Sequence, residues 1–111
     1  MIMTKIVICK DCNDAYRQLT CFGHAGFAKY GADIVCASVS VLVINTINAL
    51  EQLAGEVFET SVDEEEGFIR CDFTGPLQER SVFLLDALVF GLQNIQKEYG
   101  KKYLQVKFEE V

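Results

Sequence analysis

The chain contains little proline, a single histidine and few basic residues, and each shortage narrows what the protein can be. One proline occurs in 111 residues, and half of the residues are hydrophobic. That composition is typical of a globular protein and excludes a disordered chain. Ten Lys and Arg stand against 16 Asp and Glu, which gives a net charge of -6. Because neutralising phosphates requires Lys and Arg, we expect no direct binding to nucleic acid. An acidic chain favours solubility or a basic polypeptide partner.

No segment reaches the roughly 18 apolar residues of a membrane span, so we expect no membrane association. The start of the chain, residues 1–9, is too short for a signal peptide, and Lys5 interrupts it. The five cysteines are an odd number at irregular spacings, which indicates reduced thiols and not a disulfide framework. We therefore expect a cytoplasmic protein. Its length predicts a single domain over residues 1–111.

Hydrophobic periodicity predicts the element order ββαββαβ. Hairpins and short connections favour a mostly antiparallel sheet with two helices packed on it, an α+β fold. The predicted elements are strands over 2–9 and 16–23, a helix over 34–54, strands over 57–62 and 67–73, a helix over 77–99 and a strand over 103–108.

Both predicted helices carry more apolar residues than one core-facing stripe requires. The surplus residues are Val41 and Ile44 in the first helix and Phe83, Leu84, Ala87 and Phe90 in the second. A helix that is apolar over much of its circumference must be covered on more than one side. We therefore expect a homodimer that buries part of this surplus. The alternative is a monomer with scattered exposed apolar residues, which is common.

His24 and Cys36 are the residues best suited to chemistry. His24 follows Gly23 directly, where the second predicted strand ends, and Cys36 falls in the first turn of the first predicted helix if Asp33 is its N-cap. The partial positive charge of a helix start stabilises a cysteine thiolate, and a nearby histidine can accept the thiol proton. Eleven residues separate the two, which permits the loop to return on itself. The alternatives are a structural histidine and a buried, inert cysteine.

A zinc site is the competing interpretation of the cysteines. Cys9, Cys12, Cys21 and His24 form a possible Cys₃His set. Cys12 lies in the turn of the first hairpin, however, and His24 lies at the far end of the second strand. About eight strand residues at about 3.3 Å each place them roughly 26 Å apart, so one metal ion cannot join them. We expect no metal and no cofactor.

One stretch of the chain resembles the signature of the ribosomal-processing cysteine protease family. It reads Gly23-His24-Ala25, then Gly31-x-Asp33-Ile34-Val35-Cys36-Ala37-Ser38-Val39-Ser40. Length, element order and acidic balance extend the resemblance over essentially the whole chain. The resemblance implies a homodimeric endopeptidase. Its substrate would be the precursor of large-subunit ribosomal protein twenty-seven, from which it removes a short N-terminal extension.

The resemblance also implies roles for single residues. Cys36 would be the nucleophile and His24 the general base and acid, with Gly23, Asp33 and Ser40 supporting the site. The loop from Ala25 to Gly31 would be mobile. Its glycines, Gly26 and Gly31, permit hinge motion, so we hypothesise that substrate binding brings His24 and Cys36 into register.

The sequence is also compatible with two other classes of function. One is a non-enzymatic ribosome-assembly module that binds the same ribosomal protein, and the other is a structural dimerisation domain. Neither requires a cysteine at a helix start preceded by a histidine loop, so that pair favours the protease.

Overall fold

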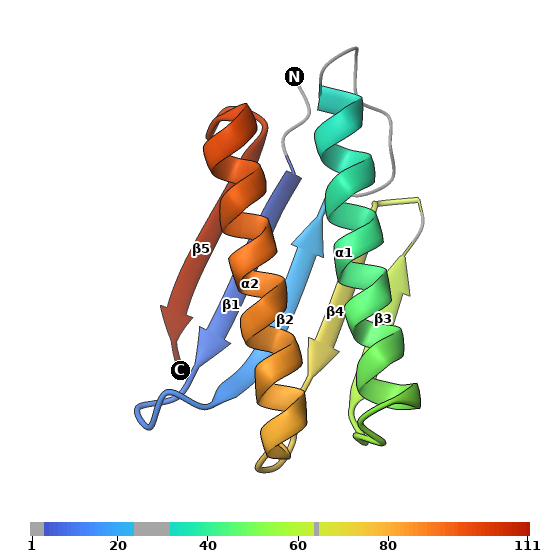
Figure 1. The fold of residues 1–111 in the computed structure, drawn as a ribbon, viewed down its shortest axis with the longest axis vertical. Coiled ribbons are helices and arrows are strands. Elements are labelled where there is room, and N and C mark those ends of the chain that lie inside the picture. The colour runs from blue at the N-terminus through green and yellow to red at the C-terminus, as the bar shows by residue number, and fades with distance from the viewer. Residues whose placement is uncertain (1–3, 24–31, 64) are drawn as a thin grey trace.

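The computed structural model describes residues 4–23, 32–63 and 65–111, and for residues 32 and 33 it describes the backbone alone. The observed order is ββαββαβ, as predicted (Figure 1). Residues 2 and 3 of the first predicted strand lie outside the described residues. The elements are β1 (Thr4–Lys10), β2 (Tyr16–Phe22), α1 (Ala32–Gln52), β3 (Glu59–Asp63), β4 (Phe68–Asp72), α2 (Glu79–Tyr99) and β5 (Leu104–Glu110).

The five strands form one sheet in the order β3-β4-β2-β1-β5. Three neighbouring pairs are antiparallel, and β1 pairs with β5 in parallel, with Thr4 opposite Leu104. Both helices lie side by side on one face of this sheet (Figure 1). The predicted α+β fold, a mostly antiparallel sheet with two helices packed on it, is confirmed.

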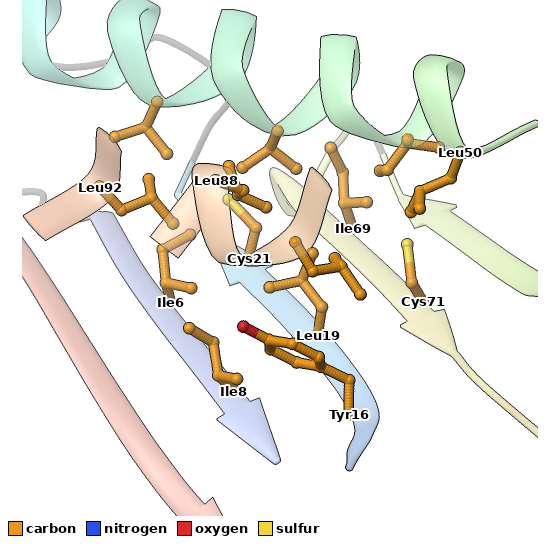
Figure 2. Close-up of a cluster of buried hydrophobic side chains, with 14 of the residues drawn as sticks. Ile6, Ile8, Tyr16, Leu19, Cys21, Leu50, Ile69, Cys71, Leu88 and Leu92 are labelled. Carbon is orange, nitrogen blue, oxygen red and sulfur yellow. The ribbon is translucent and has the colours of Figure 1, made fainter. Parts of the chain in front are cut away.

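The core lies between the sheet and the two helices. Alternate strand residues point towards the helices because successive side chains of a strand face opposite sides, and Figure 2 shows them meeting the helix side chains. The fully buried large side chains of this layer are Ile6, Ile8, Val35, Val39, Val43, Leu50, Leu85, Leu92 and Leu104. At the helix contact, Gly91 of α2 permits close approach, since a methyl group there would come within 3.0 Å of Leu42 Cδ1.

Two predictions about the ends of α1 need correction. The helix begins at Ala32, so Asp33 lies in its first turn and not at the predicted N-cap. It ends at Gln52, and Leu53, which continued the apolar spacing, is 75% exposed. Gly55 follows with a positive φ of 65°, which glycine adopts without strain, and the N–H of Glu56 then bonds to the carbonyl of Leu50. Gly55 thus lies three residues beyond the last helical residue, where the chain turns away from α1.

Most of the predicted surplus apolar residues lie on the surface. Phe83, Phe90 and Val41 are each about two-thirds exposed or more, and Leu84 packs partly against the core. Val82, on the same helix, is also exposed. The helix layer therefore presents an apolar outer surface in the single chain.

The apolar composition of α1 is also typical of a membrane-spanning helix. By length and composition, residues Ile34–Gln52 meet the requirement for a membrane-spanning helix, and they are the one such stretch in the described part of the chain. The core helices of soluble proteins meet the same requirement. Here α1 packs one face on the sheet through Val35, Val39 and Val43, which have no exposed surface.

Candidate active site

The candidate site forms where β2 ends and α1 begins, at the end of the sheet opposite the β1–β2 turn (Figure 1). Gly23, directly after β2, has a positive φ of 79°. Side chains rarely tolerate this left-handed conformation. The N–H of Gly23 bonds to the carbonyl of Gly67 at 2.7 Å, which ties the strand end to the β3–β4 turn. The end of β2 is thereby held beside this turn.

Cys36 comes from the first turns of α1 and meets this carbonyl. Its thiol donates a hydrogen bond to the Gly23 oxygen, with 2.9 Å between Sγ and O. The side chain is 1% exposed, yet it stands apart from the main apolar cluster of the core. The structure thus joins the strand end to the helix start through two residues that the sequence singled out.

Thr4 is a neighbour that sequence reasoning missed. Its hydroxyl donates to the same Gly23 oxygen at 3.4 Å, from the start of β1. The Gly23 carbonyl therefore accepts from two side chains, Cys36 and Thr4. No local pattern marks such a residue, because the acceptor is a main-chain carbonyl 19 positions away.

Cys21 is a second missed neighbour, buried beneath the helices on β2 (Figure 2). Burial, followed by the nearby Cys36 and Cys71, raises the pKa of its thiol from 9.0 to about 12. Cys21 is therefore a protonated thiol at neutral pH. Its inward position was available from strand alternation, but its proximity to Cys36 depends on how α1 crosses β2.

Several predicted site residues cannot be placed. His24, Ala25, Gly26 and Gly31 lie outside the described residues, as does the side chain of Asp33. Ser40 lies half-buried on α1, one turn beyond Cys36. Of the predicted residues, the structure therefore brings together Cys36 and Gly23.

This arrangement is suited to nucleophilic attack by a cysteine thiol. Because α1 begins at Ala32, Cys36 is its fifth residue and lies in the second turn, not in the first turn that the sequence predicted. The main-chain N–H groups of the first turn have no acceptor within the helix, and such groups can stabilise an oxyanion. Within the described part of the chain, no three His, Cys, Asp or Glu side chains are grouped to hold a metal ion. A cavity of about 350 Å³ lined by Tyr16, Pro76 and Leu77 lies near the β1–β2 turn, at the other end of the sheet.

Known proteins resemble this chain along most of its length. The family profile of the cysteine protease Prp matches residues 3–105. The ribosomal processing cysteine protease Prp of Bacillus subtilis is 34% identical over 83 residues, which cover 69% of this chain and 72% of that protein. The protein of the same name from Staphylococcus aureus is 29% identical over 79 residues, which cover 71% of this chain and 74% of that protein.

Solved structures share the fold. A Staphylococcus aureus Prp crystallised with a substrate peptide superposes with a TM-score of 0.89 at 22% identity, covering 96% of this chain and all of that one. A Streptococcus mutans protein gives a TM-score of 0.88 at 28% identity, covering 98% of this chain and 96% of that one. With the family profile spanning nearly the whole chain, the protein belongs to the Prp family of ribosomal processing cysteine proteases.

Proposed function

We propose that this protease removes the short N-terminal extension from the precursor of large-subunit ribosomal protein twenty-seven, with Cys36 as nucleophile and His24 as general base and acid. One observation carries the assignment of Cys36. Its Sγ lies at the start of α1, 2.9 Å from the carbonyl of Gly23, the residue that precedes His24 in the chain. The name of the curated relatives, ribosomal processing protease, supports a ribosomal protein as substrate.

In the proposed mechanism, His24 takes the thiol proton and the Cys36 thiolate attacks the scissile carbonyl. Main-chain N–H groups at the start of α1 stabilise the oxyanion. The tetrahedral intermediate collapses to a thioester as His24 returns the proton to the leaving amine. Water then hydrolyses the thioester and frees Cys36. Asp33 and Ser40 support this pair from the first turns of α1.

The hydrogen bond between Cys36 and Gly23 defines a resting arrangement. With 1% of its surface exposed and its proton engaged by a carbonyl, Sγ cannot meet a peptide bond. Catalysis requires that this bond break and that Sγ become accessible. The buried thiol supports our hypothesis that substrate binding moves the segment from Ala25 to Gly31, with hinges at Gly26 and Gly31, and so assembles the pair.

We also propose that the protein works in the cytoplasm as a homodimer, without membrane or direct nucleic-acid contact. The exposed apolar residues of the helix layer support the dimer: Phe83, Ala87 and Phe90 follow one face of α2. The Staphylococcus aureus Prp binds a substrate peptide in its crystal structure. By analogy, the partner of this chain is the extension peptide itself.

A cleavage assay tests the proposal. The protein is mixed with a peptide that spans the extension and its junction with the mature ribosomal protein, beside Cys36→Ala, His24→Ala and Cys71→Ala. Cys71 is a buried cysteine on β4 and serves as the matched control. We expect cleavage at one bond by the wild type and Cys71→Ala, and none by the other two. A wild type that binds the peptide without cutting it would instead indicate an assembly module.

A further inference from the structure

All five cysteines lie in the described part of the chain, and none forms a disulfide. The proposed mechanism uses only one of them. Four of them, Cys9, Cys21, Cys36 and Cys71, are buried, and Cys12 is exposed. Of the four, Cys36 is the proposed nucleophile. In the rearranged state that catalysis requires, Sγ of Cys36 is accessible, and an accessible nucleophilic thiol is the form of cysteine that oxidants attack first. The fate of an oxidised Cys36 depends on whether a second thiol lies within its reach.

Cys21 lies closest to Cys36 by the geometry of the fold. It points from β2 towards the helices, with no exposed surface (Figure 2). Gly23, two residues further along the same strand end, accepts the hydrogen bond from Cys36. Both thiols therefore occupy the space between the end of β2 and the start of α1. Cys36 raises the pKa of the Cys21 thiol, and does so more than Cys71, which agrees with this proximity.

The other three cysteines lie farther from the start of α1. Cys71 also faces the helices, but it pairs with Leu19, two residues farther than Cys21 from the end of β2 at Gly23. Cys9 follows Ile8 on β1 and so points to the sheet face that carries no helix.

Cys12 lies in the β1–β2 turn, at the end of the sheet away from α1's first turn (Figure 1). Among the five, Cys21 alone is placed to react with Cys36.

We propose that Cys21 is a resolving cysteine for Cys36, so that oxidation by a hydroperoxide joins the two in a reversible disulfide. In the first step the Cys36 thiolate attacks the peroxide, the O–O bond breaks, and Cys36 sulfenic acid and hydroxide form. In the second step the sulfur of Cys21 attacks the sulfenic sulfur. The S–S bond forms, and the oxygen leaves as water with the proton of Cys21. A dithiol returns both residues to thiols by exchange.

The disulfide would lock the site shut and protect it. It replaces the bond from Cys36 to Gly23 and holds the two Cα atoms within about 6.8 Å of each other, which draws the first turn of α1 onto β2. Cys36 held in this way cannot attack a substrate, and it cannot proceed to the irreversible sulfinic acid. The loss of activity rests on the proposed role of Cys36, whereas formation of the bond does not.

Peptide mapping tests the bond directly. Trypsin cuts after Lys and Arg, so each of the five cysteines falls in its own peptide, Cys21 in residues 18–29 and Cys36 in residues 30–70. The wild-type protein is treated with hydrogen peroxide, alkylated, digested without reductant and analysed by mass spectrometry. We expect the 18–29 and 30–70 peptides to be joined, with the protein still migrating as one chain on a non-reducing gel. A Cys36 peptide that carries only sulfinic acid, or that is joined to another cysteine or another chain, overturns the proposal.

Activity measurements test the protective role. Peroxide-treated wild type, Cys21→Ala and Cys71→Ala are reduced with dithiothreitol and assayed for peptide cleavage. We expect the wild type and Cys71→Ala to recover, and Cys21→Ala to recover about ten-fold less because its Cys36 over-oxidises. Equal recovery of all three contradicts the protective role. If none cleaves the peptide before oxidation, the proposed function fails, and the mapping still decides whether the disulfide forms.

Discussion

The thiol of Cys36 and the main-chain carbonyl of Gly23 are joined by a hydrogen bond in which 2.9 Å separates sulfur from oxygen. This contact connects the last residue before His24 with the start of α1. It depends on Gly23 in two ways, since the residue supplies the acceptor and adopts a left-handed backbone, φ 79°. Replacing this glycine therefore tests both the fold and the site.

Gly23→Ala should lower both stability and activity. A methyl group in the left-handed region costs about 1–2 kcal/mol of unfolding free energy, and relaxation of the strain shifts the carbonyl that orients Cys36. We expect peptide cleavage to fall about 10-fold to 100-fold. Urea unfolding and the cleavage assay measure the two effects.

Gly55→Ala is the matched control. Gly55 also has a positive φ, 65°, and an added methyl group would meet nothing within 4 Å. Its position after α1 lies at the other end of the helix from Cys36 (Figure 1). We expect a similar loss of stability with unchanged cleavage. An equal loss of cleavage in both variants would mean that strain alone, and not the carbonyl of Gly23, controls activity.

Glu56 should make stability depend on acid pH. The N-cap of α2, Gln78, has no side-chain cap of its own, and the Glu56 carboxylate accepts from its N–H and from the hydroxyl of Ser81. The bond from Ser81, followed by those from Gln78, holds the pKa of Glu56 below its usual 4.5. The stabilisation is therefore present above pH 4.5 and is lost as pH falls through the depressed value.

The variant Glu56→Gln should lower the unfolding free energy at neutral pH by about 1 kcal/mol, the worth of a helix cap. The deficit should shrink as the pH falls below 4.5, since protonated Glu56 no longer differs in charge from glutamine. Thermal unfolding from pH 3 to 7 measures this, with Glu98→Gln on the exposed end of α2 as control. A deficit that is constant over this range would contradict a role for the carboxylate charge.

Tyr16→Phe should weaken the attachment of α2 to the sheet. The phenol of Tyr16, 5% exposed, donates to Asp86 Oδ1 of α2 at 2.6 Å. We expect a loss of about 1–2 kcal/mol on removing the hydroxyl. Tyr99→Phe, on the exposed part of α2, should change stability little.

The phenol of Tyr16 should also make stability depend on pH in the alkaline range. Burial, and then the bond to Asp86, raise the pKa of Tyr16 above its usual 10.0. The stability that the neutral phenol provides is thus complete below pH 10 and declines as pH rises towards the folded value, because the unfolded chain ionises first. Urea unfolding at rising pH should show wild type losing more stability than Tyr16→Phe. Parallel curves for the two would refute this assignment.

Phe90→Asp should separate the proposed dimer. Phe90 is 68% exposed on the outer surface of α2, and a charge there would be buried without a partner in a dimer that uses this face. Sedimentation velocity should show a dimer for the wild type and a monomer for the variant. Val57→Asp, 88% exposed in the α1–β3 connection, should leave the dimer intact. A wild type that sediments as a monomer at all concentrations rules the dimer out.

The element order followed from the sequence because periodicity and glycine positions are local signals. Gly100 directly follows α2, Gly55 lies three residues beyond α1, and both have positive φ. Leu53 was misassigned because the apolar spacing continues beyond the last helical residue. Apolar spacing predicts which residues would share one face of a helix. It does not predict the residue at which the hydrogen bonds of the helix end.

The site was predictable in part for a similar reason. A cysteine early in a helix and a short loop before it are visible in the chain, and their spacing permits a strand end beside Cys36. The acceptor for its thiol is a main-chain carbonyl, a group that every residue has, and nothing in the sequence distinguishes that of Gly23. The nearness of Thr4 and Cys21 depends on how α1 crosses the sheet, which is a property of packing and not of local pattern.

The parallel pairing of β1 with β5 has a consequence for synthesis of the chain. β1 lies between β2 and β5, and β5 follows the other four strands along the chain. Until residues 104–110 leave the ribosome, one edge of β1 has no hydrogen-bonding neighbour. Such an edge invites pairing with other chains. A chain truncated ahead of Leu104 would keep this edge exposed and would remain prone to aggregation.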